Sequence, residues 1–202
     1  MDRVIPADSL VEVEEHQARI LDAVVRLTTE RVALRSAAGL TGAADVLAAR
    51  DVPTFDNSAM DGFAVRFDDV AGVAPGRPVV LEVVADVPAG SSLDPALLPG
   101  QAVRIMTGAA VPSQADTVVA FEDTQEGLSD GSGRITVLAA PRERGRHVRR
   151  RGEDVAAGDL LLRAGTRLGA MQVAAALSVG HVAIEVARTP RVAILSTGDE
   201  LV

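Results

Sequence analysis

Residues 63–148 alternate short extended runs with clusters of turn-forming residues, and this alternation restricts the possible folds more than any other feature. Five runs rich in Val, Ala, Ile and Thr are predicted strands, at residues 64–67, 79–87, 102–106, 117–121 and 134–138. Segments rich in Gly, Pro and Ser separate them, at residues 71–76, 88–92, 99–100 and 129–133. Short strands spaced by such turns are typical of small barrels and sandwiches. We therefore expect an all-β domain in this region.

The segments on either side of the β-rich region mix helices with strands. Apolar residues at helical spacing follow a capping-box pattern at residues 9–12 and predict a helix from about residue 10 to 27. Its apolar stripe is expected to form ordinary core or a dimer seam. A second helix is predicted at 169–178, with Gly180 at its C-terminal stop. Shorter elements are expected as strands or extended segments at 31–35, 45–49, 160–162 and 182–186, and as a short helix at 36–40. The expected fold class is α+β.

The composition excludes several classes of protein. The chain has 28 acidic and 20 basic residues, all of the latter Arg, so its formal net charge is −8. An acidic chain with 2% aromatic residues offers neither a basic surface nor stacking platforms for nucleic acid. Because Cys and Lys are absent, disulfides, thiolate chemistry and Schiff-base chemistry are excluded. The 3 His residues are dispersed, which argues against a multi-His zinc cluster.

Length and hydropathy indicate where the protein acts. The 202 residues suffice for one or two domains with a sizeable core. The sequence shows no basic-then-apolar leader and no apolar run long enough to span a bilayer. We therefore expect a cytoplasmic protein that binds neither membranes nor nucleic acid.

Residues 55–62, which we call the Asp-Gly loop, bring several polar side chains into a short span. Its two carboxylates, amide and hydroxyl belong to Asp56, Asp61, Asn57 and Ser58. Such side chains close local turns through hydrogen bonds to the backbone, and the Asp61-Gly62 pair tolerates positive φ. One interpretation is a tight turn with solvated acids. The other is a rigid loop that presents carboxylates at the mouth of the strand that follows.

Two segments near the C-terminal end carry further patterns. Residues 142–151 include six arginines, and we expect a solvated linker there, with contact to an anion as the alternative. The continuous apolar run at 192–195 is typical of a strand covered on both faces, and Ser-Thr-Gly-Asp-Glu follows it. That order is typical of the entry to an α/β ligand-binding domain. The alternative is an edge strand added to the preceding domain.

Four motifs occur in one order along the chain. They are DNSAMDGFAV at 56–65, VRIMTGA at 103–109 with ADTVV at 115–119, RRRGED at 149–154 and PRVAILSTGDEL at 190–201. Together they resemble the molybdopterin molybdenumtransferase family (MoeA type), which is shared with the C-terminal part of gephyrin. The resemblance covers essentially the whole chain, and four ordered motifs are far more specific than one. Phe63 departs from the family pattern, which commonly has Tyr at this place.

The resemblance implies a layout and a reaction. Residues 1–50 and 150–188 would form an elongated dimerisation domain, 51–149 an inserted β-rich domain, and 189–202 the first strand of a truncated α/β molybdopterin-binding domain. Family members are homodimers whose cleft lies between subunits. The implied reaction inserts molybdate into adenylylated molybdopterin with release of AMP, with a divalent cation such as Mg²⁺. Other molybdenum cofactor biosynthesis proteins are possible partners, and the chain alone is expected to be inactive.

The resemblance also implies functional residues. Asp61 would be the main cleft carboxylate and the best candidate metal ligand, and Thr107 would stand beside it with a hydroxyl group. Contacts with the cofactor are implied for Asn57, Ser58, Thr197 and Gly198. Two further acids of the cleft would be Asp154 and Glu200. For Asp154 the alternative is a buried acid paired with a neighbouring Arg.

Two other functions compete with this one. A noncatalytic scaffold or dimerisation module derived from the same family would keep the motifs without the chemistry. A hydrolase could use Asp56 and Asp61 as a carboxylate pair, but both lie in one short loop rather than flanking a groove. The second of these ranks far below the others.

Overall fold

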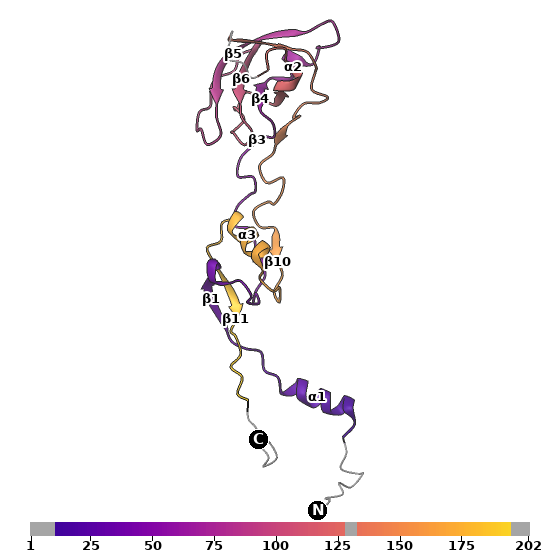
Figure 1. Ribbon diagram of the computed structural model, residues 1–202, viewed down its shortest axis with the longest axis vertical. Helices are drawn as coiled ribbons and strands as arrows, with labels where there is room; N and C mark the ends of the chain where they lie inside the picture. Colours follow the sequence, from indigo (N-terminus) through magenta and orange to yellow (C-terminus); the bar gives the residue numbers. More distant parts are fainter. Residues whose placement is uncertain (1–10, 128–132, 195–202) are drawn as a thin grey trace, which may run out of the picture. The chain divides into compact units, whose positions relative to one another are not determined.

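The computed structural model describes residues 11–127 and 133–194, and it confirms the expected mixture of helices and sheet. Most of the regular structure is strand, and the helices are few (Figure 1). The chain divides into two compact units. The first unit comprises Met1–Val46, Leu162–Ala174 and Val182–Val202, and the second comprises Leu47–Leu161 and Ala175–His181. No helix of the described residues has the length and apolar character that a bilayer crossing requires.

The first unit is built on one antiparallel strand pair. Strand β1 (Thr29–Ala33) pairs with β11 (Ala183–Ala187), from Thr29 opposite Ala187 to Ala33 opposite Ala183. The side chains of Leu34, Leu168 and Val186 are at most 1% exposed and form its core. Both strands lie within two residues of the predicted segments, because alternating apolar residues fix which positions face the core.

Helix α1 (Val13–Ala23) corrects two expectations. It begins after Glu12, whose extended backbone and lack of a side-chain cap contradict the capping box predicted at residues 9–12. Residue 9 itself lies outside the described residues. Helix α1 has no buried residue, so its apolar stripe is not part of a core within the described chain. The stripe had helical spacing, but spacing does not specify what covers a helix face.

Two further expectations fail in the first unit. The short helix expected at 36–40 is a 3₁₀ turn, η2 (Leu34–Ser36), because the chain turns directly out of β1. A strand was expected at residues 192–195. The described part of this segment, residues 192–194, does not form one. There Val192 and Ile194 are 79% and 90% exposed, since no neighbouring strand pairs with this segment among the described residues.

The second unit contains a five-stranded sheet in the order β7-β4-β6-β5-β8 (Figure 1). Its strands are β4 (Gly62–Val65), β5 (Val79–Val87), β6 (Gln101–Ile105), β7 (Thr117–Ala120) and β8 (Arg134–Val137). Only β5 and β6 run parallel; the other neighbours are antiparallel. All five predicted strands are confirmed. Four end one or two residues earlier than expected. For β4 and β7 the reason is that Phe67 begins helix α2 (Phe67–Val70) and Phe121 begins the 3₁₀ turn η3 (Phe121–Asp123).

Strands β4 and β7 of this sheet are buried on both faces. Along β4, Phe63 and Val65 pack into one apolar cluster while Ala64 packs into another. The neighbouring strand β7 shows the same alternation, with Val119 in the first cluster and Val118 in the second. Every residue of β4 and β7 is buried, so these two strands fix the position of the loop that precedes β4.

Short elements complete the chain. Strand β3 (Asn57–Ser58) pairs antiparallel with β9 (Val148–Arg149), and β2 (Val46–Leu47) pairs with β10 (Leu160–Leu162). Helix α3 (Ala170–Ser178) confirms the second predicted helix. Gly180 adopts a φ of 99° just beyond its end, as a left-handed C-terminal stop requires.

Candidate functional site

The Asp-Gly loop is held by its own side chains. The Ser58 hydroxyl donates to the carbonyl oxygen of Met60 at 2.5 Å and accepts from the Met60 N–H at 3.3 Å. The Asn57 amide donates to the carbonyl oxygen of Phe55 at 3.2 Å. Ser58 is completely buried and Asn57 is 7% exposed. Both side chains therefore support the loop, and their implied contacts with a cofactor stay a prediction.

The Met-Thr-Gly turn at residues 106–108 is fastened to this loop through the backbone. The Gly108 N–H donates to the Ser58 carbonyl oxygen at 2.8 Å, and the Ser58 N–H donates to that of Ala109 at 3.0 Å. The φ of Gly108 is 81°, in the left-handed region that favours glycine. The glycine therefore lets the turn reverse tightly enough to bring Thr107 over the loop.

Asp61 and Thr107 meet where these two segments join. Asp61 Oδ1 accepts hydrogen bonds from both the backbone N–H and the hydroxyl of Thr107, each at 2.7 Å. These bonds, the backbone one first, lower the pKa of Asp61 below its ordinary value, and burial opposes them only in part. Within residues 11–127 and 133–194, Oδ2 has no hydrogen-bond partner of its own. Asp61 is thus an ionised, oriented carboxylate with one oxygen available.

Gly62 is required for a different reason than the sequence indicated. Its φ lies outside the left-handed region, so the tolerance of a positive φ that this pair offers is not used here. A Cβ atom at this position would lie 2.1 Å from the carbonyl oxygen of Val119 on β7. Glycine is needed because the neighbouring strands β4 and β7 approach closely here, directly beside Asp61.

Asp56 differs from Asp61 because both of its oxygens are engaged. The Arg151 N–H donates to Oδ1 at 2.8 Å, and the Arg150 guanidinium donates to Oδ2 at 2.6 Å. The backbone N–H of Arg151 is the largest cause of the lowered pKa of Asp56. Asp56 therefore links the loop to the arginine run, and the structure does not support an Asp56–Asp61 hydrolase pair.

The arginine run is more ordered than the solvated linker predicted for it. Three of its six arginines form ion pairs, Arg144 with Asp68 and Asp116, Arg150 with Asp56, and Arg151 with Asp51. The sequence offered possible partners for these arginines, namely the acidic residues spread through 51–116. Their pairing could not be assigned, because the partners lie between 28 and 100 residues apart.

Of the other candidate acids, Asp154 and Glu200, only Asp154 lies among the described residues. Asp154 is exposed, and its backbone N–H donates to the carbonyl oxygen of Val52 at 3.0 Å. The alternative of a buried Asp154 paired with Arg is wrong, since no ion pair to it occurs in the described part of the chain. Thr197, Gly198 and Glu200 lie outside the described residues.

Comparison with known proteins decides the family. The model of the MoeA N-terminal region (domain I and II) matches residues 11–180. The chain belongs to this family. The MoeA N-terminal region of this protein also resembles curated relatives. One is molybdopterin molybdenumtransferase 2 of Mycobacterium tuberculosis, 41% identical over 94% of this chain and 45% of the relative. Another, molybdopterin molybdenumtransferase of Nostoc, is 45% identical over 86% of this chain and 39% of the relative.

A solved structure supports the same assignment. The molybdopterin biosynthesis MoeA protein from Pyrococcus horikoshii matches with a TM-score of 0.80 and 33% sequence identity. The match covers 89% of this chain and 46% of that one. The chain therefore spans about half the length of the relatives it matches, and the fold of its MoeA N-terminal region is that of solved MoeA structures.

No group of three or more His, Cys, Asp or Glu side chains suited to a metal occurs in residues 11–127 and 133–194. Mg²⁺ needs fewer protein ligands than this, because it is usually held by one or two carboxylates together with waters and substrate phosphates. The available oxygen of Asp61 fits one such ligand.

Replacing Thr107 with Val tests the geometry of the MoeA site. The variant keeps the backbone N–H but loses the hydroxyl that donates to Asp61. We expect the pKa of Asp61 to rise part of the way toward its ordinary value of 3.8, because a bond to the charged form is lost. Carboxyl-carbon NMR titration measures this, with the exposed Thr54→Val variant as control. An unchanged Asp61 pKa in Thr107→Val contradicts the geometry.

Proposed function

We propose that this chain acts in molybdenum cofactor biosynthesis as the N-terminal part of a molybdopterin molybdenumtransferase. The reaction is insertion of molybdate into adenylylated molybdopterin with release of AMP. One observation carries the proposal: Asp61 lies in the family's Asp-Gly loop, ionised and fixed by Thr107, with Oδ2 available. The printed names of the curated relatives support it, since they are molybdopterin molybdenumtransferases.

The lowered pKa of Asp61 favours one role over another. Molybdate and phosphate are anions, so a carboxylate is a poor direct ligand for either. A carboxylate with a lowered pKa is also a weak general base, because efficient proton transfer requires a pKa near the working pH. Asp61 therefore serves to hold Mg²⁺ or to orient a water molecule, as an oxygen ligand does. When bound, the cation supplies positive charge that offsets the phosphate charge of the substrate.

The proposed arrangement is a composite site in a cytoplasmic homodimer. Residues 1–50 and 150–188 form the dimerisation domain, and 51–149 form an inserted barrel- or sandwich-like domain that carries Asp61 and Thr107. An α/β molybdopterin-binding domain begins at residue 189 and contributes Thr197, Gly198 and Glu200 from the partner subunit, while Asp154, Asn57 and Ser58 complete this half of the cleft. The exposed apolar side chains of α1, among them Val13, Ile20 and Leu21, support a role in dimerisation.

A subunit-mixing experiment tests this proposal. A full-length enzyme that begins with this sequence and carries Asp61→Ala is mixed with the present chain, which keeps Asp61. We expect neither protein alone to insert molybdate and the mixture to do so, because the mixed dimer contains one complete cleft. The assay follows AMP release, and sedimentation verifies that mixed dimers form. Mixed dimers without activity overturn the composite site.

A further inference from the structure

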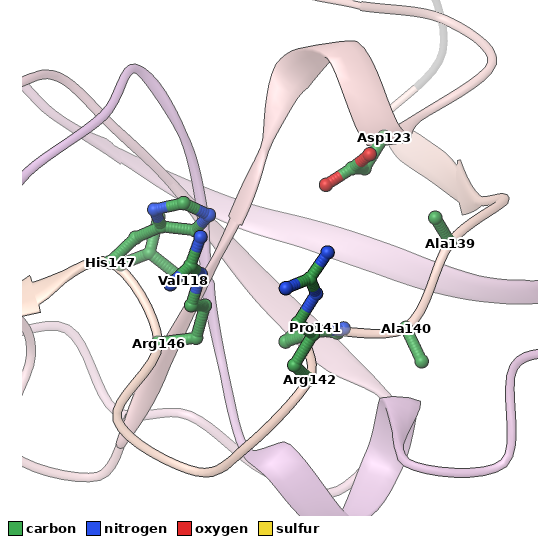
Figure 2. A pocket seen from close by; sticks show the side chains of 8 residues that line it. All are labelled: Val118, Asp123, Ala139, Ala140, Pro141, Arg142, Arg146 and His147. Carbon is green, nitrogen blue, oxygen red and sulfur yellow. The ribbon is translucent and has the colours of Figure 1, made fainter.

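A cluster of cationic groups lies in a pocket of the second unit that Asp61 does not line. This pocket has a volume of about 220 Å³ and is lined by arginine, histidine and aspartate side chains: Arg142, Arg146, His147 and Asp123 (Figure 2). We propose that it binds a small tetrahedral oxyanion that carries a proton, of the phosphate or phosphomonoester class. This site does not depend on the proposed insertion reaction.

The charges of the pocket lack partners inside the described chain. Arg144, Arg150 and Arg151 of the arginine run form ion pairs, whereas no carboxylate lies within ion-pair distance of Arg142 or Arg146 in residues 11–127 and 133–194. Figure 2 shows both guanidinium groups of the pocket, with the carboxylate of Asp123 on the facing wall. Two unpaired guanidinium groups in one concave site favour an oxyanion, which accepts their hydrogen bonds in a fork geometry.

The arginine-bearing turn is fixed before any ligand binds. The Val118 N–H donates to the Arg146 carbonyl oxygen at 3.0 Å, and the Gly145 N–H donates to the hydroxyl of buried Thr117 at 3.1 Å. His147 has a φ of 61°, an uncommon value for a residue other than glycine, and its carbonyl oxygen accepts from the Ala59 N–H at 2.8 Å. Such preorganisation lowers the entropic cost of binding.

His147 contributes hydrogen bonds rather than charge. Burial is the largest cause that lowers its pKa, and the charge of Arg146 acts in the same direction. Asp123 and Glu122 oppose both effects without cancelling them. The imidazole is therefore neutral at neutral pH and can donate to an oxyanion through one ring nitrogen.

Asp123 and the pocket size define the ligand class. Pockets for drug-sized ligands measure roughly 300–1,000 Å³, so this one suits a small anion rather than a whole nucleotide or pterin. An ionised carboxylate repels a fully deprotonated anion but accepts a hydrogen bond from one that keeps a proton. Inorganic phosphate keeps at least one proton near neutral pH and phosphomonoesters keep one for part of the time, whereas sulfate and molybdate keep none. Asp123 therefore selects phosphate over the other two ions.

Isothermal titration of the chain with inorganic phosphate, sulfate and molybdate at constant ionic strength tests the proposal. We expect saturable binding of phosphate, at least about tenfold tighter than that of sulfate or molybdate, which corresponds to one lost charge-assisted hydrogen bond. Arg142→Ala and Arg146→Ala are each expected to weaken phosphate binding at least about tenfold. Asp123→Asn is expected to remove the preference for phosphate.

Arg149→Ala is the matched control, because Arg149 belongs to the same run, is exposed and does not line the pocket. It removes the same charge and is expected to leave phosphate binding unchanged. Circular dichroism verifies that each variant is folded. The proposal is overturned if phosphate does not saturate the chain, if Arg149→Ala weakens binding as much as the pocket variants, or if molybdate or sulfate binds as tightly as phosphate.

Discussion

Replacement of Asp61 by Asn in a full-length enzyme that begins with this sequence is expected to slow molybdate insertion at least about 100-fold. The amide oxygen of Asn can still accept both hydrogen bonds from Thr107, so the loop keeps its shape. What the variant loses is the negative charge on the available oxygen, and with it the ability to hold a hard cation. The rate of AMP release under saturating substrate measures the effect.

Asp94→Asn is the matched control for this prediction. Asp94 is also an exposed carboxylate that accepts a backbone N–H, from Ser113 at 2.8 Å, and its pKa is likewise lowered. It lies outside the Asp-Gly loop, so we expect its replacement to leave the rate unchanged. An Asp61→Asn enzyme as fast as the Asp94→Asn enzyme contradicts the role assigned to Asp61.

Replacement of Gly62 by Ala is expected to lower the free energy of unfolding by about 3 kcal/mol or more. The added Cβ would meet the Val119 carbonyl oxygen at 2.1 Å, and backbone atoms cannot move aside as the end of a flexible side chain can. Every residue of both strands at this contact is buried, so relief requires β4 and β7 to separate. Urea unfolding followed by far-ultraviolet circular dichroism measures the change, since the chain has no Trp or Tyr for fluorescence.

Gly72→Ala provides the comparison. Gly72 also lies in the second unit, its φ is outside the left-handed region, and a Cβ there would meet no atom within 4 Å. We expect the free energy of unfolding of the Gly72→Ala variant to stay within about 1 kcal/mol of that of the parent protein. Equal stabilities of the two variants contradict the close strand approach at Gly62.

The strands of the second unit could be predicted because local pattern and tertiary environment agree there. Residues 79–87 form β5 with the predicted bounds, as alternating apolar residues between turn clusters indicate. The sequence could not predict that β5 pairs in parallel with β6, since strand order depends on contacts between distant residues. It also could not predict why Gly62 is required, because the cause is a carbonyl oxygen of another strand.

The candidate site was predictable to a similar extent. The family motifs named Asp61 and Thr107 as neighbours, and the structure brings them into contact. The same motifs could not separate Asp56 from Asp61. Both are loop acids in the sequence, and only the bonds from Arg150 and Arg151 show that Asp56 is fully engaged. The sequence offered anion contact as an alternative for the arginine run but could not locate the pocket around Arg146, because unpaired charges are recognised only after the paired ones are known.

The Asp-Gly loop depends on partners that are synthesised long after it. Ser58 is fastened to Gly108, and Asp56 is fastened to Arg150 and Arg151. Translation proceeds at about 5–20 residues per second, so a ribosome needs on the order of ten seconds to pass from the loop to Arg151. During that interval the nascent loop lacks its arginine contacts. The Asp-Gly loop is consequently completed late in the synthesis of this protein, at a time set by chain elongation rather than by local turn formation.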